Sequence, residues 1–333
     1  MRIAVIGGGA IGSVLAAYLS KAGEDVLLVG KKDHTDAINA NGLKVTGVRG
    51  EETFRLKCAT KLDEEHDLVI FVTKSQDLEH AYQANVDFLE NCDVLTTQNG
   101  VQGDNILSCH FERDKMFSSI VMFGATYVKP GEVTFNFEGD WILGRPYVPV
   151  DPKTHALAEK LNKAVKTVVS DNIIAMKWLK LFVNFNNCIP AVIGKSMQET
   201  FADLDLCKLS IMLLKEGVDI IKEAHIELVS LPDFPANRIY GLVGMPIEQA
   251  AEIIHQTLPN LSKEPLYGSI LQSIMRKRTS EIDFINGEIV AMAGEMQKDV
   301  PLNARIVDMV HEVEQSGKFF EIEDVKQEFN LTV

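Results

Sequence analysis

The sequence "RIAVIGGGAIG", residues Arg2 to Gly12, is the most informative segment of the chain. Its apolar first half predicts a buried β-strand, and the following "AIGSVLAAYLSKAG" predicts a helix. Glycines between them stand in the G-x-G-x-x-G register, where they let the backbone approach a pyrophosphate at the helix N-terminus. A purely structural tight turn is the alternative. The predicted pyrophosphate-binding residues are Gly7, Gly8, Gly9, Ala10, Ile11 and Gly12.

The end of the next strand bears on the choice of dinucleotide. An NAD site usually places Asp or Glu there, about 20 residues after the glycines, to bind the ribose 2′-hydroxyl. The stretch "DVLLVGKKDH" instead has Lys31 and Lys32 after Gly30. Because two amines suit a 2′-phosphate, we predict NADP(H) as the cofactor. The alternative is that both are ordinary surface lysines and that Asp33 turns inward.

Two more loops follow predicted core strands. "VTKSQD" contains Lys74, and "TTQNGVQG" contains Asn99 beside Gly100. Open α/β sheets bind ligands at the carboxyl ends of their strands, so both residues are candidate ligand-binding residues. Ordinary turn chemistry is the alternative for each loop.

Composition narrows the class of protein. The chain has 333 residues, 46% of them hydrophobic and 24% charged, as in ordinary globular proteins with two domains. A net charge of −14 argues against nucleic acid or an anionic membrane as a partner. The five cysteines are odd in number and contain no C-x-x-C pair, which favours free thiols. We therefore expect a soluble, cytoplasmic protein with no metal site.

The order of the predicted elements gives the fold class. Strands alternate with helices in the first half, which predicts an α/β fold with a parallel sheet. The β-rich segment from Phe117 to Gly144 is expected to be a partly antiparallel extension of that sheet. Beyond Asp171 the patterns are helical. We predict a Rossmann-type dinucleotide-binding domain at residues 1–170 and an all-α domain at residues 171–333.

An unusual helix is predicted at "MKWLKLFVNFNN", residues Met176 to Asn187. Most of its residues are large and apolar, as in a core helix. At about 3.6 residues per turn, Lys177, Lys180, Asn184 and Asn187 nevertheless fall on one side of it. The alternative is that the lysines are solvated surface residues whose aliphatic stems cover apolar neighbours.

A second candidate segment is "GSILQSIMRKRTSEIDFING", which carries Ser269 and Glu281 on either side of a basic turn. We expect Glu281 to begin a helix, with Thr279 or Ser280 as its N-cap. The structural interpretation is that this acid only interacts with the helix dipole.

Ordered motifs along nearly the whole chain resemble the ketopantoate reductase family, the NADPH-dependent 2-dehydropantoate 2-reductases. The motifs in question are "RIAVIGGGAIG", "VGKK", "VTKS", "TQNGVQG", "GATYVKPGEV", "KLFVN", "SILQSI", "SEIDFING" and "PLNARI". The resemblance implies a Rossmann domain and a helical domain that close a cleft over the substrate. It implies reduction of ketopantoate, a small 2-oxo acid, to pantoate.

The resemblance also implies roles for single residues. Lys31 would bind the 2′-phosphate, and Lys180 would be the proton donor. The polar side of the helix that carries Lys180 would then face the cleft. A cation at this position stabilises the negative charge that forms on the ketone oxygen. The implied nicotinamide-end residues are Lys74, Asn99 and Ala125. The implied substrate ligands are Asn99, Lys180, Asn184, Asn187 and Ser269, with Ser269 on the carboxylate, and Glu281 would act near the cofactor and Lys180.

Two positions depart from the family pattern. Cys188 stands where a second asparagine is usual, and Asn187 is one residue before it. Ser273 stands where an aspartate is common. These departures leave open a paralogue that reduces another 2-oxo acid or forms an opine-like product. A nucleotide-sensing protein without turnover is the alternative of another class, and the oligomeric state is also open, with a homodimer among the alternatives.

Overall fold

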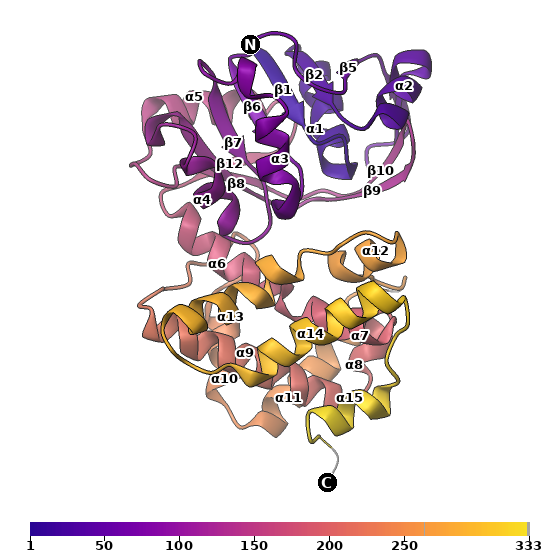
Figure 1. The fold of residues 1–333 in the computed structure, drawn as a ribbon, viewed down its shortest axis with the longest axis vertical. Helices are drawn as coiled ribbons and strands as arrows, with labels where there is room; N and C mark the ends of the chain where they lie inside the picture. Colours follow the sequence, from indigo (N-terminus) through magenta and orange to yellow (C-terminus); the bar gives the residue numbers. More distant parts are fainter. Residues whose placement is uncertain (263, 332–333) are drawn as a thin grey trace. The chain divides into compact units, whose positions relative to one another are not determined.

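The computed structural model describes residues 1–262 and 264–331. The chain divides into two compact units, Met1–Ile174 and Ala175–Val333 (Figure 1). The first is a mixed α/β unit and the second is helical, which confirms the predicted fold class.

The elements of the first unit begin and end as follows. The strands are β1 Arg2–Ile6, β2 Asp25–Val29, β3 Leu43–Gly47, β4 Glu52–Phe54, β5 Lys57–Ala59, β6 Leu68–Phe71, β7 Asp93–Thr96, β8 Met116–Val121, β9 Gly124–Lys129, β10 Glu132–Phe137, β11 Trp141–Gly144 and β12 Thr167–Ser170. The helices, with η marking 3₁₀ turns, are α1 Ala10–Lys21, α2 Lys32–Asn41, η1 Ser75–Asp77, α3 Leu78–Gln83, η2 Val86–Phe88, α4 Gln102–Ser108, η3 Arg113–Lys115 and α5 Pro152–Leu161.

The main sheet contains eight strands in the order β12-β11-β8-β7-β6-β1-β2-β5. From β5 to β8 the pairing is parallel throughout, and the chain order matches the doubly wound dinucleotide-binding sheet. The central strands β1 and β6 are almost wholly buried, as expected when helices cover both faces. The loops after β1, β2, β6 and β7 therefore leave from the same edge of this sheet.

The segment from Phe117 to Gly144 corrects one expectation. β8 and β11 extend the main sheet, with β11 antiparallel to β8. The hairpin β9–β10 instead belongs to a separate four-stranded sheet in the order β4-β3-β10-β9. It leaves the main sheet because β10 pairs in parallel with β3, a partner that lies far away in the sequence.

Apolar side chains pack on both faces of the main sheet. On one face, α1 lies between the main sheet and the smaller sheet, and its residues Val14 to Leu19 are buried. On the other face, Leu78 of α3 and Leu107 of α4 pack against β1, β6 and β7. This packing holds the strand ends that carry the predicted cofactor residues.

The second unit is built from helices in its described part. Their bounds are α6 Ile173–Asn184, which starts at the unit boundary, η4 Phe185–Asn187, α7 Cys188–Ile193, α8 Met197–Phe201, α9 Leu204–Glu223, α10 Asn237–Gly244, α11 Ile247–Thr257, η5 Leu258–Asn260, α12 Ser269–Met275, η6 Ile282–Phe284, α13 Asn286–Glu295, α14 Pro301–Ser316 and α15 Ile322–Glu328.

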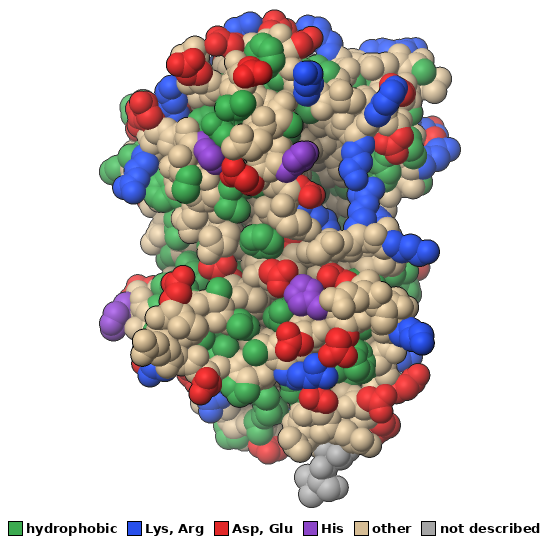
Figure 2. Space-filling model, in the orientation of Figure 1, with side chains coloured by type: hydrophobic (Ala, Val, Ile, Leu, Met, Phe, Trp, Pro, Cys, Tyr) green, Lys and Arg blue, Asp and Glu red, His purple; other side chains and the backbone are tan. Residues whose placement is uncertain are grey.

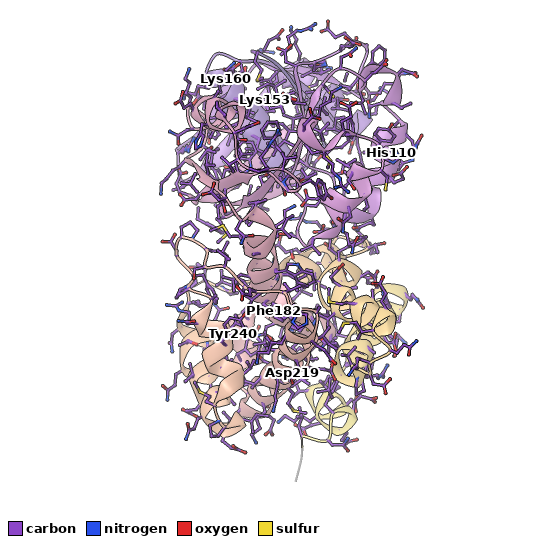
Figure 3. The ribbon with its side chains drawn as sticks, turned by 90° about the vertical axis from the view of Figure 1, so that its left-hand side faces the viewer. His110, Lys153, Lys160, Phe182, Asp219 and Tyr240 are labelled. Carbon is purple, nitrogen blue, oxygen red and sulfur yellow. The ribbon has the colours of Figure 1, made fainter. Side chains whose placement is uncertain are left out.

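The long helix α9 organises the second unit. It packs against α10, α11, α13 and α14, and it begins at Asp203, whose carboxylate accepts from the backbone N–H of Asp205 and Leu206. Gly217 of α9 lets the aromatic rings beside it approach closely: a Cβ there would lie 3.0 Å from Phe182 of α6. Phe182 lies inside the helical unit (Figure 3). The apolar side of α6 is thus a core face.

Surface charge and helix length agree with the composition. Acidic and basic side chains are interspersed over the face of each unit that Figure 2 shows, within a chain of net charge −14. Among the described residues, none of the helices combines the length and the apolarity that crossing a membrane requires.

Candidate functional site

The glycine loop after β1 has the geometry of a phosphate cradle. Gly7 has φ +125°, and a Cβ on it would lie 2.6 Å from the backbone N of Thr73. A Cβ on Gly12 would lie 2.1 Å from the Gly7 carbonyl oxygen. Gly9, in contrast, faces open space and caps α1 without a side-chain hydrogen bond. Backbone N–H groups of the first turn of α1 are thus presented without a competing side chain, which fits a pyrophosphate.

The turn after β2 holds the two candidate phosphate-reading lysines. Lys31 is exposed and is the N-cap residue of α2. Lys32 is also exposed, but its Nζ lies 2.6 Å from the carboxylate of Asp36 one turn along the helix. Asp33 is exposed in the first turn of α2. Lys31 is therefore the lysine better disposed to bind a 2′-phosphate, and Lys32 is tied to its own helix.

His34 is a buried residue of this region that the sequence analysis missed. Its Nε2 lies 3.0 Å from the Ser13 hydroxyl of α1, and its Nδ1 accepts from the backbone N–H of Gly131 at 3.0 Å. A Cβ on Gly8 would lie 3.3 Å from the imidazole ring. Burial lowers the pKa of His34, which keeps the ring neutral. His34 thus joins the glycine loop, α2 and the β9–β10 turn, and only the tertiary structure could show it.

The loops after β6 and β7 lie against each other. Lys74 is the N-cap residue of η1, and Asn99 precedes Gly100, whose φ is +77°. The Ser75 hydroxyl donates to the Asn99 carbonyl oxygen at 3.3 Å. The structure therefore brings together the Lys74 and Asn99 loops, as expected from the parallel pairing of β6 with β7.

Ala125 lies in the smaller sheet. It is the second residue of β9, pairs with Phe135 of β10, and packs half-buried on the apolar core of the unit. Its position at the nicotinamide end stays a prediction.

On α6, the two predicted lysines differ in accessibility. Lys177 is only 2% exposed, whereas Lys180 is half-buried. Burial lowers the pKa of Lys180 to about 8, because a desolvated ammonium is less stable than one in water. Lys180 is therefore the amine that can both keep access and exchange a proton near neutral pH.

The expected helix over residues 176–187 is wrong at its end. The α-helix stops at Asn184, Phe185–Asn187 form a 3₁₀ turn, and α7 starts at Cys188. At three residues per turn, the side chains of Asn184 and Asn187 fall in line, so the polar side of α6 continues through the turn. Cys188 is fully buried, and its Sγ donates to the Phe185 carbonyl oxygen at 3.1 Å. The Cys188 side chain is thus part of the core.

Asn187 instead packs against the segment that carries Ser269. A Cβ on Gly268 would lie 2.8 Å from both Cγ and Oδ1 of Asn187. Ser269 is the next residue, exposed, and the first of α12. The glycine therefore makes room for the Asn187 amide beside Ser269, and the structure brings these two predicted ligands into one region.

Glu281 corrects the expectation that it begins a helix. It precedes the short 3₁₀ turn η6, and α13 starts only at Asn286. The two do not merge because Ile285 between them has φ −118° and ψ −89°, outside the helical region. Glu281 is itself the N-cap residue of η6, and the Ser280 hydroxyl one residue earlier accepts from the backbone N–H of Ile282 at 3.3 Å, the contact expected of an N-cap side chain. The backbone N–H of Ser280 donates at 2.7 Å to Glu314, which anchors this segment to α14, and Glu281 is 9% exposed.

Two surface hollows in the described part of the chain have volumes of about 470 and 310 Å³. Neither is lined by a residue of the predicted site.

Comparison with known families matches both units. Residues 3–146 match the family described as ketopantoate reductase PanE/ApbA, and residues 172–314 match the description of its C-terminal part. The chain belongs to the ketopantoate reductase family. It is therefore an oxidoreductase of the 2-dehydropantoate 2-reductase type, which acts on a ketone or the corresponding secondary alcohol.

Individual relatives agree over nearly the whole length. A 2-dehydropantoate 2-reductase of Pyrococcus abyssi is 30% identical over 307 residues, 91% of this chain and 94% of that protein. A crystal structure of a PanE/ApbA family ketopantoate reductase from Ralstonia eutropha is 25% identical, with a TM-score of 0.80 over 95% of this chain and 99% of that one. D-mandelate dehydrogenase, solved with NADH and anilino(oxo)acetate, has the same fold at 24% identity, with a TM-score of 0.81 over 95% and 99% of the two chains.

Proposed function

We propose that this member of the ketopantoate reductase family reduces a small 2-oxo acid with NADPH, and that ketopantoate, reduced to pantoate, is the substrate. The names of the relatives support the reaction. The observation that carries the proposal is Lys180, a half-buried amine with its pKa lowered to about 8, one turn before Asn184 on α6.

Lys180 serves as the general acid in this proposal. A bound nicotinamide supplies hydride, which is added to the ketone carbon. The charge that then forms on the ketone oxygen is stabilised by the Lys180 ammonium, which donates its proton to that oxygen and becomes a neutral amine. A pKa of about 8 leaves most of this amine protonated at pH 7 and makes proton release easier than from an ordinary lysine.

Amides and hydroxyls orient the substrate without adding charge. Asn184 and Asn187 donate to its oxygens, and Ser269 binds its carboxylate. Asn99 contributes from the loop after β7. Glu281, a buried carboxylate, acts near Lys180 and the cofactor.

The cofactor is proposed to be NADPH on the strength of Lys31. The glycine loop, Gly7 to Gly12, holds the pyrophosphate, and Lys31 binds the 2′-phosphate, with Lys32 as a minor contributor because of its ion pair. Lys74, Asn99 and Ala125 line the nicotinamide end. NADH is the competing cofactor, since D-mandelate dehydrogenase of the same fold holds NADH.

Cys188 and Ser273 depart from the family pattern, and these departures favour a second candidate substrate. Cys188 is buried, so it adds no polar group to the substrate region, and the Ser273 hydroxyl donates to the Ser269 carbonyl oxygen at 2.9 Å inside α12. A 2-oxo acid with a different side chain would meet this altered lining.

The test is a steady-state assay of the purified protein. Oxidation of NADPH and of NADH is followed with ketopantoate and with a panel of other 2-oxo acids, ranked by kcat/KM. We expect the highest value with NADPH and ketopantoate. A higher value with another 2-oxo acid would select the paralogue, and binding of NADPH without turnover of any acid would select a nucleotide-sensing protein.

A further inference from the structure

Gln98 is a buried amide in the loop after β7 that the proposed chemistry does not use. It is 5% exposed. Its Nε2 donates to two backbone carbonyl oxygens of the neighbouring loop, that of Phe71 at 2.9 Å and that of Thr73 at 3.0 Å. Carbonyl oxygens only accept, so this orientation of the amide is the one that satisfies both contacts.

The same two loops are joined by a second side chain. The Thr97 hydroxyl donates to the Phe71 carbonyl oxygen at 2.8 Å, and the Thr97 backbone N–H donates to Gln98 Oε1 at 3.2 Å. Each polar atom of the Gln98 amide therefore has a partner, and the chain between Phe71 and Lys74 is held from the side of β7.

Close backbone contacts leave the Gln98 amide little room to move. A Cβ on Gly103 would lie 2.9 Å from Gln98 Oε1, so α4 lies directly against the amide. On the far side of the held loop, a Cβ on Gly7 would lie 2.6 Å from the backbone of both Val72 and Thr73. The segment before Lys74 is thus confined between the glycine loop and Gln98.

We propose that Gln98 is a positioning residue that sets where Lys74 stands relative to Asn99 at the nicotinamide end of the site. Gln98 precedes Asn99 directly, and its amide holds the carbonyl oxygen of Thr73, the residue before Lys74. One side chain therefore controls the separation of two loops that present ligand-binding groups. This inference rests on the proposed role of both loops in cofactor binding.

The decisive variant is Gln98→Met, which keeps the length of the side chain and removes both donors. NADPH affinity, measured by the fluorescence of the bound nicotinamide without any substrate, should fall on the order of tenfold, as expected from the loss of two hydrogen bonds. Adenosine 2′,5′-bisphosphate lacks the nicotinamide, so its affinity should stay within about twofold of the parent value. Equal losses for both ligands would show a merely structural role and overturn the proposal.

A double-mutant cycle tests whether the effect passes through Lys74. In a Lys74→Ala background, Gln98→Met should cause little further loss of NADPH affinity, because there is no amine left to misplace. Losses that multiply would overturn the proposal. These measurements follow binding and need no turnover. They therefore test the role of Gln98 even if ketopantoate is not the substrate.

A variant that adds a negative charge at Gln98 tests the same contacts in another way. Gln98→Glu places a carboxylate against two carbonyl oxygens, and NADPH affinity should fall further than in Gln98→Met. Gln83→Glu is the matched control, since Gln83 is an exposed amide of the same unit whose Nε2 donates to Glu79 one turn earlier in α3. It should bind NADPH like the parent. If Gln98→Glu fails to fold, Gln98→Met still decides the question.

Discussion

Single residues in this chain combine apolar surroundings with one ionisable or polar group. Lys180 stands in a helix whose neighbours Leu179 and Leu181 are fully buried. Such surroundings shift the pKa of an amine without removing its access to a ligand. The same local environment explains why a lysine, and not an arginine, suits this position, since the guanidinium does not give up its proton near neutral pH.

Lys180→Ala tests the proton donor. We expect a folded protein that binds NADPH like the parent, with kcat lowered by about 10² to 10⁴, the usual contribution of a positioned general acid. Circular dichroism and fluorescence titration check folding and binding. Near-parental turnover with ketopantoate would move the donor elsewhere, with Lys74 as the next candidate.

The pH dependence of the parent protein follows from the same residue. The acid acts only while protonated, and the pKa of Lys180 is about 8, so kcat/KM for ketone reduction should be level below pH 8 and fall above it. Alcohol oxidation with NADP⁺ requires the neutral amine and should rise through the same pH. A reduction profile that stays level to pH 9.5 would contradict the assignment.

We predict different effects on cofactor affinity for substitutions of Lys31 and of Lys32, because the surroundings of the two lysines differ. Lys31→Ala should weaken NADPH binding by about tenfold to a hundredfold, the loss expected when one charge-assisted contact is removed. The affinity for NADH should stay nearly unchanged. Lys32→Ala is the matched control and should cost less, since Lys32 is paired with Asp36. Equal losses for both cofactors in Lys31→Ala would show that Lys31 does not read the 2′-phosphate.

At the scale of elements, short turns decide where polar groups lie. The 3₁₀ turn η4 between α6 and α7 turns Asn187 toward Gly268, and the break at Ile285 keeps Glu281 out of α13. Both features place candidate site residues at helix ends. Side chains there are free of the regular spacing that a continuous helix imposes.

Gly268→Ala tests this arrangement. The new Cβ would lie 2.8 Å from the Asn187 amide, a flexible group that can rotate away, so we expect a folded protein with the amide displaced. KM for the 2-oxo acid should rise by about threefold to tenfold, the effect of one lost hydrogen bond, with NADPH affinity unchanged.

Two controls accompany Gly268→Ala. In an Asn187→Ala background the substitution should have no further effect on KM, because the side chain with which it collides is gone. Gly241→Ala in α10 should be silent, since a Cβ there meets nothing within 4 Å. A rise in KM that persists without the Asn187 amide would remove Asn187 from the substrate region.

At the scale of the whole molecule, the cysteines differ in accessibility. All five are free; Cys92, Cys188 and Cys207 are buried, Cys58 is half-buried, and Cys109 is exposed. Burial raises the pKa of the Cys58 thiol to about 11 and that of Cys92 to about 12. A buried thiol with a raised pKa is a poor nucleophile.

Alkylation of the native protein should therefore modify Cys109 first and leave the other four thiols unmodified over the same time. All five should react after denaturation. Mass spectrometry of the iodoacetamide-treated protein measures this, with Cys109→Ser as the control that should show no rapid labelling. Rapid native labelling of Cys188 would contradict its place in the core of the helical unit.

Features that depend on neighbours along the chain could be predicted from the amino-acid sequence. The strand β1, the glycine turn and α1 follow from a short stretch, because apolar alternation, positive φ and helix initiation are local properties. The parallel sheet and the helical second half follow from repeated patterns of the same kind. The proximity of the Lys74 and Asn99 loops follows from parallel pairing alone.

Features that join residues far apart in the sequence could be seen only in the folded protein. The pairing of β10 with β3 removes the β9–β10 hairpin from the main sheet, and it depends on complementary edges about 90 residues apart. His34 and Gln98 are ordinary in sequence, yet each forms a hydrogen bond with a backbone group of another loop. A buried polar side chain takes its partners from whatever folding places beside it, and no local pattern records those partners.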